Sequence, residues 1–457
     1  MISRLSRLRI APRASLVLAA ALGLNAAAPA QQSPPAAAPA APAYYTVTSL
    51  GAMELDENGA AQRYYQPVDI NAAGQVVGSF VDWTAEPPES RAVVWPAAGS
   101  AAAPTFLPHP RADSTFSVAW AINGSGHAAG MSSAYGEAQS AVVWKEDGTT
   151  VDLGWPWVYD GYTMPSRATG INDAGVVAGS FSTPYGERGF VWRDANGNGA
   201  LDAGEAAVLG LLRGSETDWG YTYTGEVNAS GQVAGYSTIP GGQRAFVWKD
   251  GRMIDLGCLF TNETGGGSSQ AASINDAGQV AGTSTVDRNH NRRAFLWRDA
   301  NGNGASDAGE MADLGCLGAY TYTDQWGTPQ SYAFSEAFDV NNGGQVVGVS
   351  TTPDAVQHAV LWENGAMVDL NDRIDPASGW ELTGAIGIND RGEIVGDGYR
   401  NGVPHAIRLR PNRAPVAAAD ARSTDEDAAL SGASLTGRTV IETVAVALVP
   451  PLPSSAR

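Results

Sequence analysis

The apolar residues of this chain recur in short runs rather than in long helical stripes. Runs such as GQVVG, RAFVW and MIDLG are separated by Asn, Asp, Gly and Pro, which favour tight turns. Most runs lack a strict alternation of apolar and polar residues, as expected for strands that are packed on both faces. The pattern therefore predicts an all-β protein made of many short strands.

The runs belong to a repeat whose first block is Ile or Val, then Asn-x-x-Gly, then small apolar residues. The seven copies are INAAGQVVG from Ile70, INGSGHAAG from Ile122, INDAGVVAG from Ile171, VNASGQVAG from Val227, INDAGQVAG from Ile274, VNNGGQVVG from Val340 and INDRGEIVG from Ile388. A second block such as RAFVW follows each copy, and a third block such as IDLG comes next in most units. Repetition on this scale is typical of propellers and solenoids.

Each repeat predicts a meander of four strands. The Asn-x-x-Gly segment is a tight turn between strands one and two, with Gly at positive φ, and the second and third blocks supply strands three and four. Seven such sheets, placed radially, form a seven-bladed β-propeller. The seventh repeat ends at HAIRLRP without a fourth strand, and residues 44–53, YYTVTSLGAM, resemble that missing strand. We therefore predict that the N-terminal strand closes the propeller and leaves no exposed sheet edge.

The three blocks together resemble the bacterial family of HAF extracellular repeats. In that family an Ile-Asn-Asp-x-Gly-Gln-Val-Val-Gly block precedes a His-Ala-Phe-Leu-Trp block and an Asp-Leu-Gly block. The resemblance covers about residues 44–410, and His358-Ala-Val-Leu-Trp362 is closest to the naming motif. It implies export and tandem β repeats, but no catalytic activity.

The two ends of the chain differ in composition from the repeats. Residues 1–30 have a basic start, an apolar run and Ala28-Pro-Ala30, which indicate a secretory signal peptide, and residues 31–43 form a Pro/Ala-rich linker. The predicted propeller spans residues 44–411. Residues 412–457 begin like a cadherin-like tandem adhesin domain but are too short for one, so we expect a disordered tail. The expected location is secreted or on the cell surface.

Charge and apolar content restrict the partners. The net charge of −19 repels phosphate backbones and argues against nucleic acid. After residue 30, no run approaches the twenty apolar residues of a membrane span, so we expect no membrane insertion. We also expect a monomer. Cys258 and Cys316 occupy equivalent DLGCL segments of neighbouring repeats, which we expect to lie too far apart for a disulfide.

Catalytic patterns are scarce in the sequence. The five histidines do not pair at metal-ligand spacing, and no HExxH, GxSxG or CxxC occurs. His358 and His405 occupy equivalent repeat positions, and the Asp of each Asp-Leu-Gly block recurs with the repeat, so we interpret both as structural. Acidic pairs could serve a propeller glycosidase, but the sequence singles out no pair.

Aromatic insertions after the fourth strands are the main candidates for ligand binding. We expect them to converge around one mouth of the central channel, where exposed rings suit sugar or peptide. The alternative is that they only pack over the blade ends. The residues are Trp155, Trp157, Tyr159, Tyr162, Trp219, Tyr221, Tyr223, Tyr320, Tyr322 and Trp326.

Two segments match the twelve-residue calcium loop, which places oxygen ligands at positions 1, 3, 5, 7, 9 and 12 and Gly at position 6. The predicted ligands of the first are Asp194, Asn196, Asn198, the carbonyl of Ala200, Asp202 and Glu205. Those of the second are Asp299, Asn301, Asn303, the carbonyl of Ala305, Asp307 and Glu310. A plain Asn-Gly turn would need no acids at positions 9 and 12, so the sequence predicts Ca²⁺ as the bound cofactor.

The sequence thus predicts an exported, calcium-stabilised β-propeller that acts as a non-enzymatic binding or adhesion module. Its ligands would be a glycan or a surface protein, held by the aromatic-rich face. The alternative is a propeller enzyme, a glycoside hydrolase or lyase that acts on polysaccharide.

Overall fold

The computed structural model describes residues 45–100, 102–134, 137–154, 158–159, 162–215, 218–261, 267–288, 291–323 and 327–412. The predicted signal peptide, the linker and the tail after residue 412 lie outside these residues. The described residues all belong to one compact unit, Met1–Pro415, and the second unit, Val416–Arg457, is not described. Within the described part, no helix has the length and apolar character needed to cross a bilayer.

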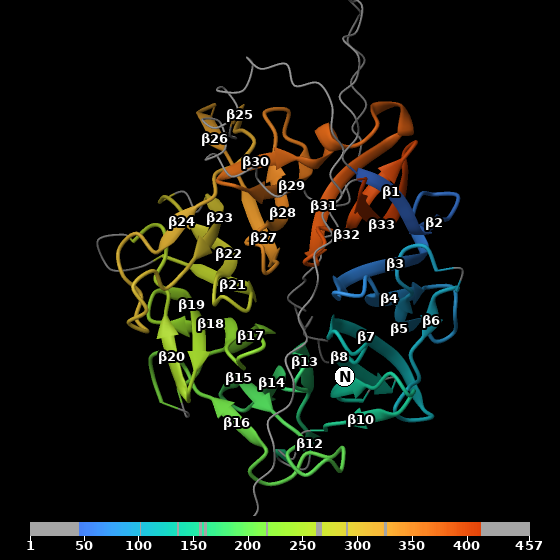
Figure 1. Cartoon of the computed structure of the whole chain (residues 1–457), viewed down its shortest axis with the longest axis vertical. Helices are drawn as coiled ribbons and strands as arrows, with labels where there is room; N and C mark the ends of the chain where they lie inside the picture. The colour runs from blue at the N-terminus through green and yellow to red at the C-terminus, as the bar shows by residue number, and fades with distance from the viewer. Residues whose placement is uncertain are drawn as a thin grey trace, which may run out of the picture. The chain divides into compact units, whose positions relative to one another are not determined.

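The described residues form an all-β structure of antiparallel meanders arranged around a common centre (Figure 1). We call each meander a unit and number the units along the chain. The first unit contains β3 (Ala61–Ile70), β4 (Val76–Asp82), β5 (Glu89–Trp95) and β6 (Thr105–Phe106), and β2 (Glu54–Leu55) pairs with β3. The second contains β7 (Ser114–Ile122), β8 (Ala128–Ala134), β9 (Ser140–Trp144) and β10 (Thr150–Asp152). A single parallel bridge, Ser90 to Phe116, joins these two units.

The next four units follow the same order. The third contains β13 (Ser166–Ile171), β14 (Val177–Thr183), β15 (Gly186–Trp192) and β16 (Ala206–Leu209). The fourth contains β17 (Thr222–Val227), β18 (Val233–Ile239), β19 (Gly242–Lys249) and β20 (Arg252–Asp255). The fifth contains β21 (Ser269–Ile274), β22 (Val280–Thr285), β23 (Arg292–Trp297) and β24 (Met311–Asp313). The sixth contains β27 (Ser335–Val340), β28 (Val346–Thr351), β29 (Gln357–Glu363) and β30 (Ala366–Asp369).

Four shorter strands and two helical turns lie between units. The strands form two separate hairpins, β11 (Val158–Tyr159) with β12 (Tyr162–Thr163), and β25 (Tyr320–Thr323) with β26 (Pro329–Tyr332). The 3₁₀ turns η1 (Leu370–Arg373) and η2 (Pro376–Ser378) connect the sixth unit to the seventh.

The seventh unit takes its outer strand from the other end of the chain. It contains β31 (Trp380–Ile388), β32 (Ile394–Arg400) and β33 (Val403–Pro411), and its fourth strand is β1 (Tyr45–Ala52). The strand β1 runs antiparallel to β33, with Tyr45 opposite Pro411 and Ala52 opposite His405. The predicted pairing of the N-terminal strand with the last repeat is therefore observed.

The Asn-x-x-Gly turn between strands one and two is built as predicted. In the first unit the Asn71 side chain accepts a hydrogen bond from the N–H of Gln75 at 2.9 Å. The backbone carbonyl of Asn71 accepts a hydrogen bond from the N–H of Gly74, which has a φ of 83°. A residue with a Cβ is disfavoured at that φ, so Gly is required there.

The asparagines also connect the units to one another. Each side-chain amide donates to the backbone carbonyl of the asparagine in the next unit, over 2.8 to 3.0 Å. We call this set the asparagine ring. In order, its members are Asn71, Asn123, Asn172, Asn228, Asn275, Asn341 and Asn389, and Asn389 donates back to Asn71. All seven are at most 6 % exposed, so each bond is shielded from water.

The core lies between neighbouring units. In the third unit the Gly179 residue of strand two is closely covered, because a Cβ there would lie 2.3 Å from the Arg167 carbonyl and 2.4 Å from the Phe190 ring. Phe190 and Trp192 of strand three are buried in an apolar cluster that includes Val143 of the second unit. Close packing between neighbouring units thus explains both the small residues of strand two and the bulky residues of strand three.

The first prediction concerns β1. Deleting residues 44–53 should lower the melting temperature by at least roughly 5 °C, because the deletion exposes the β33 edge and removes the Leu50 carbonyl that accepts the Trp95 indole N–H. Thermal unfolding followed by circular dichroism measures the change. Deletion of residues 412–457 is the control, and we expect it to leave the melting temperature nearly unchanged. An unchanged melting temperature in the first variant would disprove the role of β1.

The second prediction concerns the asparagine ring. In Asn228→Asp, an oxygen replaces the amide that donates to the Asn275 carbonyl at 3.0 Å and to Gln232 at 2.8 Å. The buried carbonyl then lacks its donor, and we expect a loss of about 1–3 kcal/mol in the free energy of unfolding. Denaturant titration measures it, with Asn58→Asp in an exposed turn as the matched control. Equal stability of the two variants would contradict the proposed contribution of the ring.

Candidate functional sites

Four aromatic rings form a continuous series across the start of the fourth unit. Trp219 meets Tyr221 edge to face at 4.9 Å between ring centroids, and Tyr221 stacks on Tyr223 at 5.8 Å with an interplanar angle of 15°. Tyr223 in turn lies 5.1 Å from Tyr236 of strand two, and Arg167 covers the Tyr223 ring at 5.2 Å. We call these four residues the aromatic ladder. Trp219, its outer end, is 67 % exposed.

The segment that carries Trp219 is held by an arginine of the preceding unit. Arg188, which is 3 % exposed, donates to the carbonyls of Gly220 and Asp218, both at 2.8 Å. The equivalent Arg244 and Arg293 donate to the carbonyls of Gly267 and Ala333. The Arg of the strand-three block therefore holds the segment that enters the next unit. In the fourth unit this segment carries the exposed indole of Trp219 between two carbonyls that Arg188 binds.

A second aromatic group lies on the β25–β26 hairpin. Tyr320 contacts Tyr322 at 6.2 Å and Tyr332 at 5.5 Å, and Tyr322 is 49 % exposed. In Figure 1 the β25–β26 hairpin and β12 lie at the outer edge of the arrangement, whereas β17 lies near its centre. The prediction that the three insertions converge around one central mouth is therefore wrong for these two hairpins, because both lie away from the centre.

Trp155, Trp157 and Trp326 lie outside the described residues. Tyr159 and Tyr162 belong to β11 and β12, but the structure describes only their backbone.

The first predicted calcium loop follows β15 directly and folds back on itself. The Asp194 carboxylate accepts the N–H groups of Gly197 at 2.7 Å and Gly199 at 3.0 Å. The amides of Asn196 and Asn198 both donate to one oxygen of Asp202, at 2.7 and 2.6 Å. These two bonds are the main reason that the pKa of Asp202 is lowered. Positions 3, 5 and 9 of the loop thus meet at one point.

Glu205, at position 12, closes the same loop. Its carboxylate accepts the N–H groups of Ala195 at 2.9 Å and of Asp202 at 3.1 Å. The loop is anchored by Leu201, which packs on the apolar cluster shared with the second unit. Ala200 lies between these anchors, and its N–H donates to Asn198 at 2.8 Å.

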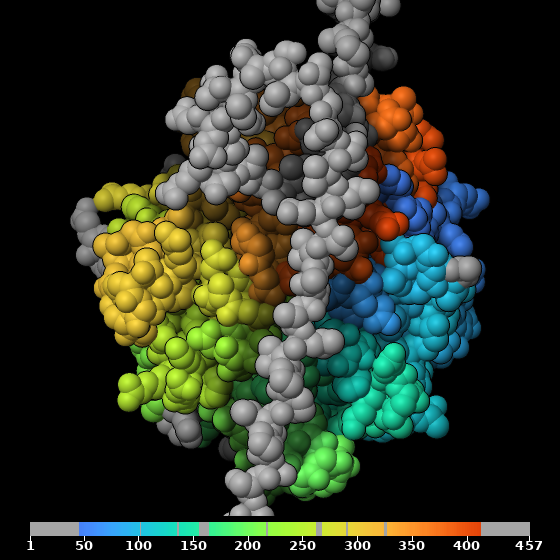
Figure 2. All heavy atoms as spheres, viewed as in Figure 1, coloured from blue at the N-terminus to red at the C-terminus, as the bar shows by residue number. Residues whose placement is uncertain are grey.

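The second loop, after β23, repeats this arrangement. Asp299 accepts the N–H of Gly304 at 2.8 Å, and Asn301 and Asn303 donate to Asp307 at 2.6 and 2.7 Å. Glu310 accepts the N–H of Asp307 at 2.8 Å, and Ala305 donates to Asn303 at 2.7 Å. The two loops appear as projecting lobes in Figure 2, green at the bottom and gold at the left.

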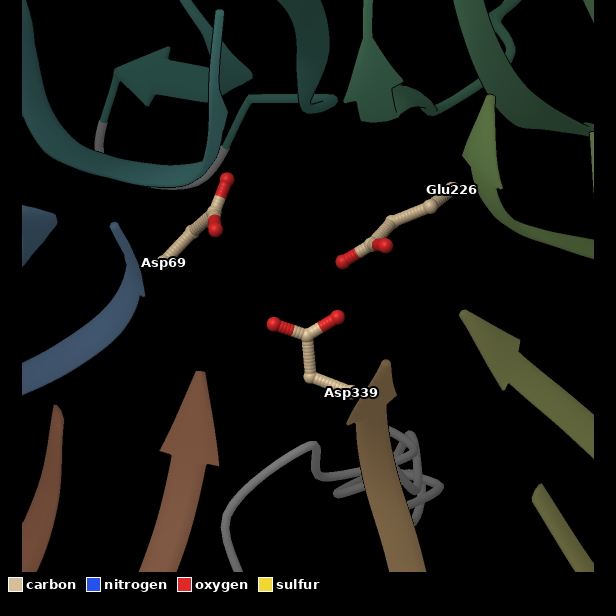
Figure 3. Close-up of side chains that lie close together, drawn as sticks. All are labelled: Asp69, Glu226 and Asp339. Atoms are coloured by element: carbon tan, nitrogen blue, oxygen red, sulfur yellow. The ribbon is translucent and has the colours of Figure 1, made fainter. Parts of the chain in front are cut away.

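Three carboxylates that were not predicted from the sequence meet at the centre (Figure 3). Asp69 of β3, Glu226 of β17 and Asp339 of β27 point toward one another, and one oxygen of each lies within 4.8 Å of the others. No other set of three acidic, His or Cys side chains is this close within the described residues. We call these three residues the central carboxylates.

The central carboxylates also connect units through hydrogen bonds. Asp69 accepts the N–H of Ile122 in the second unit at 2.8 Å, and Asp339 accepts the N–H of Ile388 in the seventh unit at 2.7 Å. The Ser273 hydroxyl lies 2.6 Å from Glu226 and 2.7 Å from Asp339.

A signal for this group was present in the repeat. All three acids directly precede the Ile or Val of the Ile-Asn block, where the other units carry small residues. These are Ala121, Gly170, Ser273 and Gly387.

Two other carboxyl groups, one beside the ladder and one in the seventh unit, have raised pKa values. Burial raises the pKa of Glu187, although Arg167 pairs with it at 2.5 Å and opposes the shift. Burial likewise raises the pKa of Asp397, in β32, to about 7.

The residues interpreted as structural have structural partners. The Asp of each Asp-Leu-Gly block accepts the N–H two residues later, at 2.8 to 3.0 Å. His358 pairs with Asp369 at 2.6 Å, and His405 lies 2.8 Å from the Ser49 hydroxyl of β1. Cys258 and Cys316 are free thiols, as expected for equivalent positions in neighbouring units. The acids of the third blocks are Asp152, Asp255, Asp313 and Asp369.

Comparisons with known proteins add no family. No family model matches the sequence, and no curated protein matches it.

Solved structures show distant likeness. The acylaminoacyl peptidase of Pyrococcus horikoshii has 11 % identity and a TM-score of 0.42, over 73 % of this chain and 49 % of the peptidase. The β-propeller domain of the trilobed protease of Pyrococcus furiosus has 13 % identity and a TM-score of 0.34, over 68 % of this chain and 97 % of that domain. The Aleuria aurantia lectin in complex with a fucosyl disaccharide has 13 % identity and a TM-score of 0.34, over 69 % of this chain and 97 % of the lectin. This chain thus spans about half the length of the first of these proteins.

Proposed function

We propose that the chain is a seven-bladed β-propeller closed by β1, which acts as an exported, non-enzymatic binding or adhesion module for carbohydrate or protein ligands. The blade count and closure are supported by the cyclic order of the asparagine ring, since Asn389 of the last unit donates to Asn71 of the first. Export and HAF-type repeats, expected from the sequence, are part of the same proposal.

The aromatic ladder is the observation that carries the binding function. Trp219 is 67 % exposed and continues into three further rings, so the ladder offers a larger aromatic surface to a ligand than an isolated exposed ring does. Arg188 holds the backbone on both sides of that ring, so little conformational entropy is lost when a ligand stacks on it. The apolar face of a sugar ring stacks well on such aromatic groups, and the Tyr hydroxyls can bond sugar hydroxyls.

The alternative, a glycoside hydrolase or lyase, would need a carboxyl pair free to exchange protons with substrate. The central carboxylates are the closest candidates in the described residues, but Asp69 and Asp339 each accept two backbone N–H bonds. Such bonds hold each carboxylate in place and suit a role in joining the units. We therefore favour the binding module over the enzyme.

The expected partners follow from charge and shape. A net charge of −19 disfavours nucleic acid, and the proposed ligands are a glycan or a surface protein. We propose a monomer that is secreted or held at the cell surface without membrane insertion.

We further propose that both loops bind Ca²⁺. The donor set suits this ion, because three carboxylates, two amide oxygens and a backbone carbonyl supply hard oxygen ligands in each loop. In the first loop Asn196 and Asn198 already face Asp202, and rotation of each amide would turn its oxygen toward that point. A calcium ion there would attract the side-chain oxygens of Asn196 and Asn198, whose amide nitrogens now donate to Asp202.

The third prediction tests the ligand site. Replacing the exposed Trp219 by Ala should weaken binding at least about tenfold to glycans that wild type retards in affinity electrophoresis, because stacking area is lost. Trp83→Ala, which removes a 54 % exposed ring elsewhere, is the matched control.

Melting temperatures of these variants separate binding from packing. We expect them to match wild type, and loss of folding would support the packing interpretation. Incubation with the protein should create no new reducing ends and no unsaturated products in the same glycans. Formation of such products would favour the enzyme.

The fourth prediction tests calcium. Calorimetric titration should show two sites with a dissociation constant on the order of 10⁻⁴ M, in the range of extracellular modules. At a hundredfold excess over that constant each site adds about 2.7 kcal/mol to the free energy of unfolding. The Glu205→Ala, Glu310→Ala double variant should lose both effects, and Glu57→Ala, Glu137→Ala should keep them. Absence of heat and of thermal shift in wild type at millimolar calcium would disprove the proposal.

A further inference from the structure

One position of the repeat changes from apolar to cationic in the seventh unit only. The residue before the last residue of the strand-three block is apolar in the first six units and is Arg408 in the seventh. Arg408 is nevertheless only 5 % exposed, so it occupies the interior site that the repeat gives to Val or Leu. The apolar residues are Val94, Val143, Val191, Val247, Leu296 and Leu361.

A buried guanidinium needs a partner for each N–H group, or burial costs free energy. One amino group of Arg408 donates to the Pro96 carbonyl at 3.0 Å. Its Nε is buried and has no hydrogen-bond partner within the described structure. Burial also lowers the pKa of Arg408, which the charge of Glu393 opposes. The seventh unit thus carries a buried cation where the other six units carry an apolar residue.

Arg408 lines a cavity of about 540 Å³ between β1, β33 and the segment that follows β5. We call it the latch pocket. Its polar walls come from Thr46, Thr48, Ser49, Ser100, Arg408 and Arg410. No Asp or Glu lies among the described residues that line it, although the whole protein carries an excess of acid.

The charges around the pocket leave Arg408 available for a ligand. Arg410 lies 3.8 Å from a carboxylate oxygen of Glu393, and Arg391 lies 3.3 Å from the other oxygen. Glu393 thus offsets part of the charge of those two arginines. Arg408 makes no ion pair within 4.0 Å in the described structure, and it is one of the two arginines that line the pocket.

We propose that the latch pocket binds a small acidic sugar, with the sugar carboxylate held by the guanidinium groups of Arg408 and Arg410. A carboxylate matches a guanidinium in geometry and charge. The volume exceeds that of a bare oxyanion and lies in the range of small-molecule sites. The hydroxyls of Thr48, Ser49 and Ser100 can exchange hydrogen bonds with the hydroxyls of a uronate ring. This site lies at the junction of the seventh and first units, so it does not rest on the aromatic ladder.

The test is calorimetric titration of the full chain with sodium glucuronate, sodium sulfate and glucose at constant ionic strength. Glucuronate should bind wild type with a millimolar dissociation constant and raise its melting temperature, whereas glucose should do neither. Arg408→Leu should weaken glucuronate binding at least about tenfold. Its melting temperature should equal or exceed that of wild type, because Leu is the residue of the fifth and sixth units.

Two further variants keep the test decisive. Arg408→Lys retains the charge but loses the planar guanidinium, and it should bind glucuronate more weakly than wild type even if Arg408→Leu fails to fold. Arg111→Leu removes an exposed charge that lies outside the pocket lining and should bind like wild type. Absence of glucuronate binding at 20 mM, or equal binding by wild type and the Arg408 variants, would overturn the proposal. Binding of sulfate without glucuronate would also overturn it, since the pocket would then be a bare oxyanion site.

Discussion

The side-chain amide of one asparagine per repeat is the interaction on which the rest of the structure depends. Its oxygen accepts a backbone N–H four residues later and so shapes the turn between strands one and two, as in Asn71 with Gln75. Its nitrogen donates to the next unit, as in Asn71 with the Asn123 carbonyl. A single residue therefore specifies the local turn and the placement of the neighbouring unit. Each such bond contributes about 1 kcal/mol, and the bonds are buried away from competing water.

The chemistry of the molecule is found where a unit departs from the repeat. Acids replace small residues at Asp69, Glu226 and Asp339, and an arginine replaces a Val or Leu at Arg408. The calcium-type loops occur after strand three in the third and fifth units. The aromatic ladder begins in an insertion and ends on Tyr236 of strand two. A scaffold fixed by the common positions can thus carry different groups at the variable ones.

The sequence was sufficient for the local structure and for one long-range pairing. Turn residues and apolar runs predicted the strands, and the missing fourth strand of the last repeat predicted the pairing of β1 with β33. The central carboxylates were not predicted, since Asp69 and Asp339 lie far apart in sequence and meet only because their strands face the same centre. The inter-unit bond of each asparagine was missed for a similar reason. Strand propensity specifies a strand, but not which side chains from different units converge.

The closing bond of the asparagine ring has a consequence for the order of folding. Asn389 and Asn71 are 318 residues apart in the chain, and Thr46 bonds Asn412 across 366 residues. Closure of such a long loop costs chain entropy before any native contact between the ends can repay it. During synthesis the first unit therefore has no neighbour on one side until the seventh has been made. The first six units can add sequentially through short-range contacts, while the joining of the two ends should be the slow, concluding step of folding.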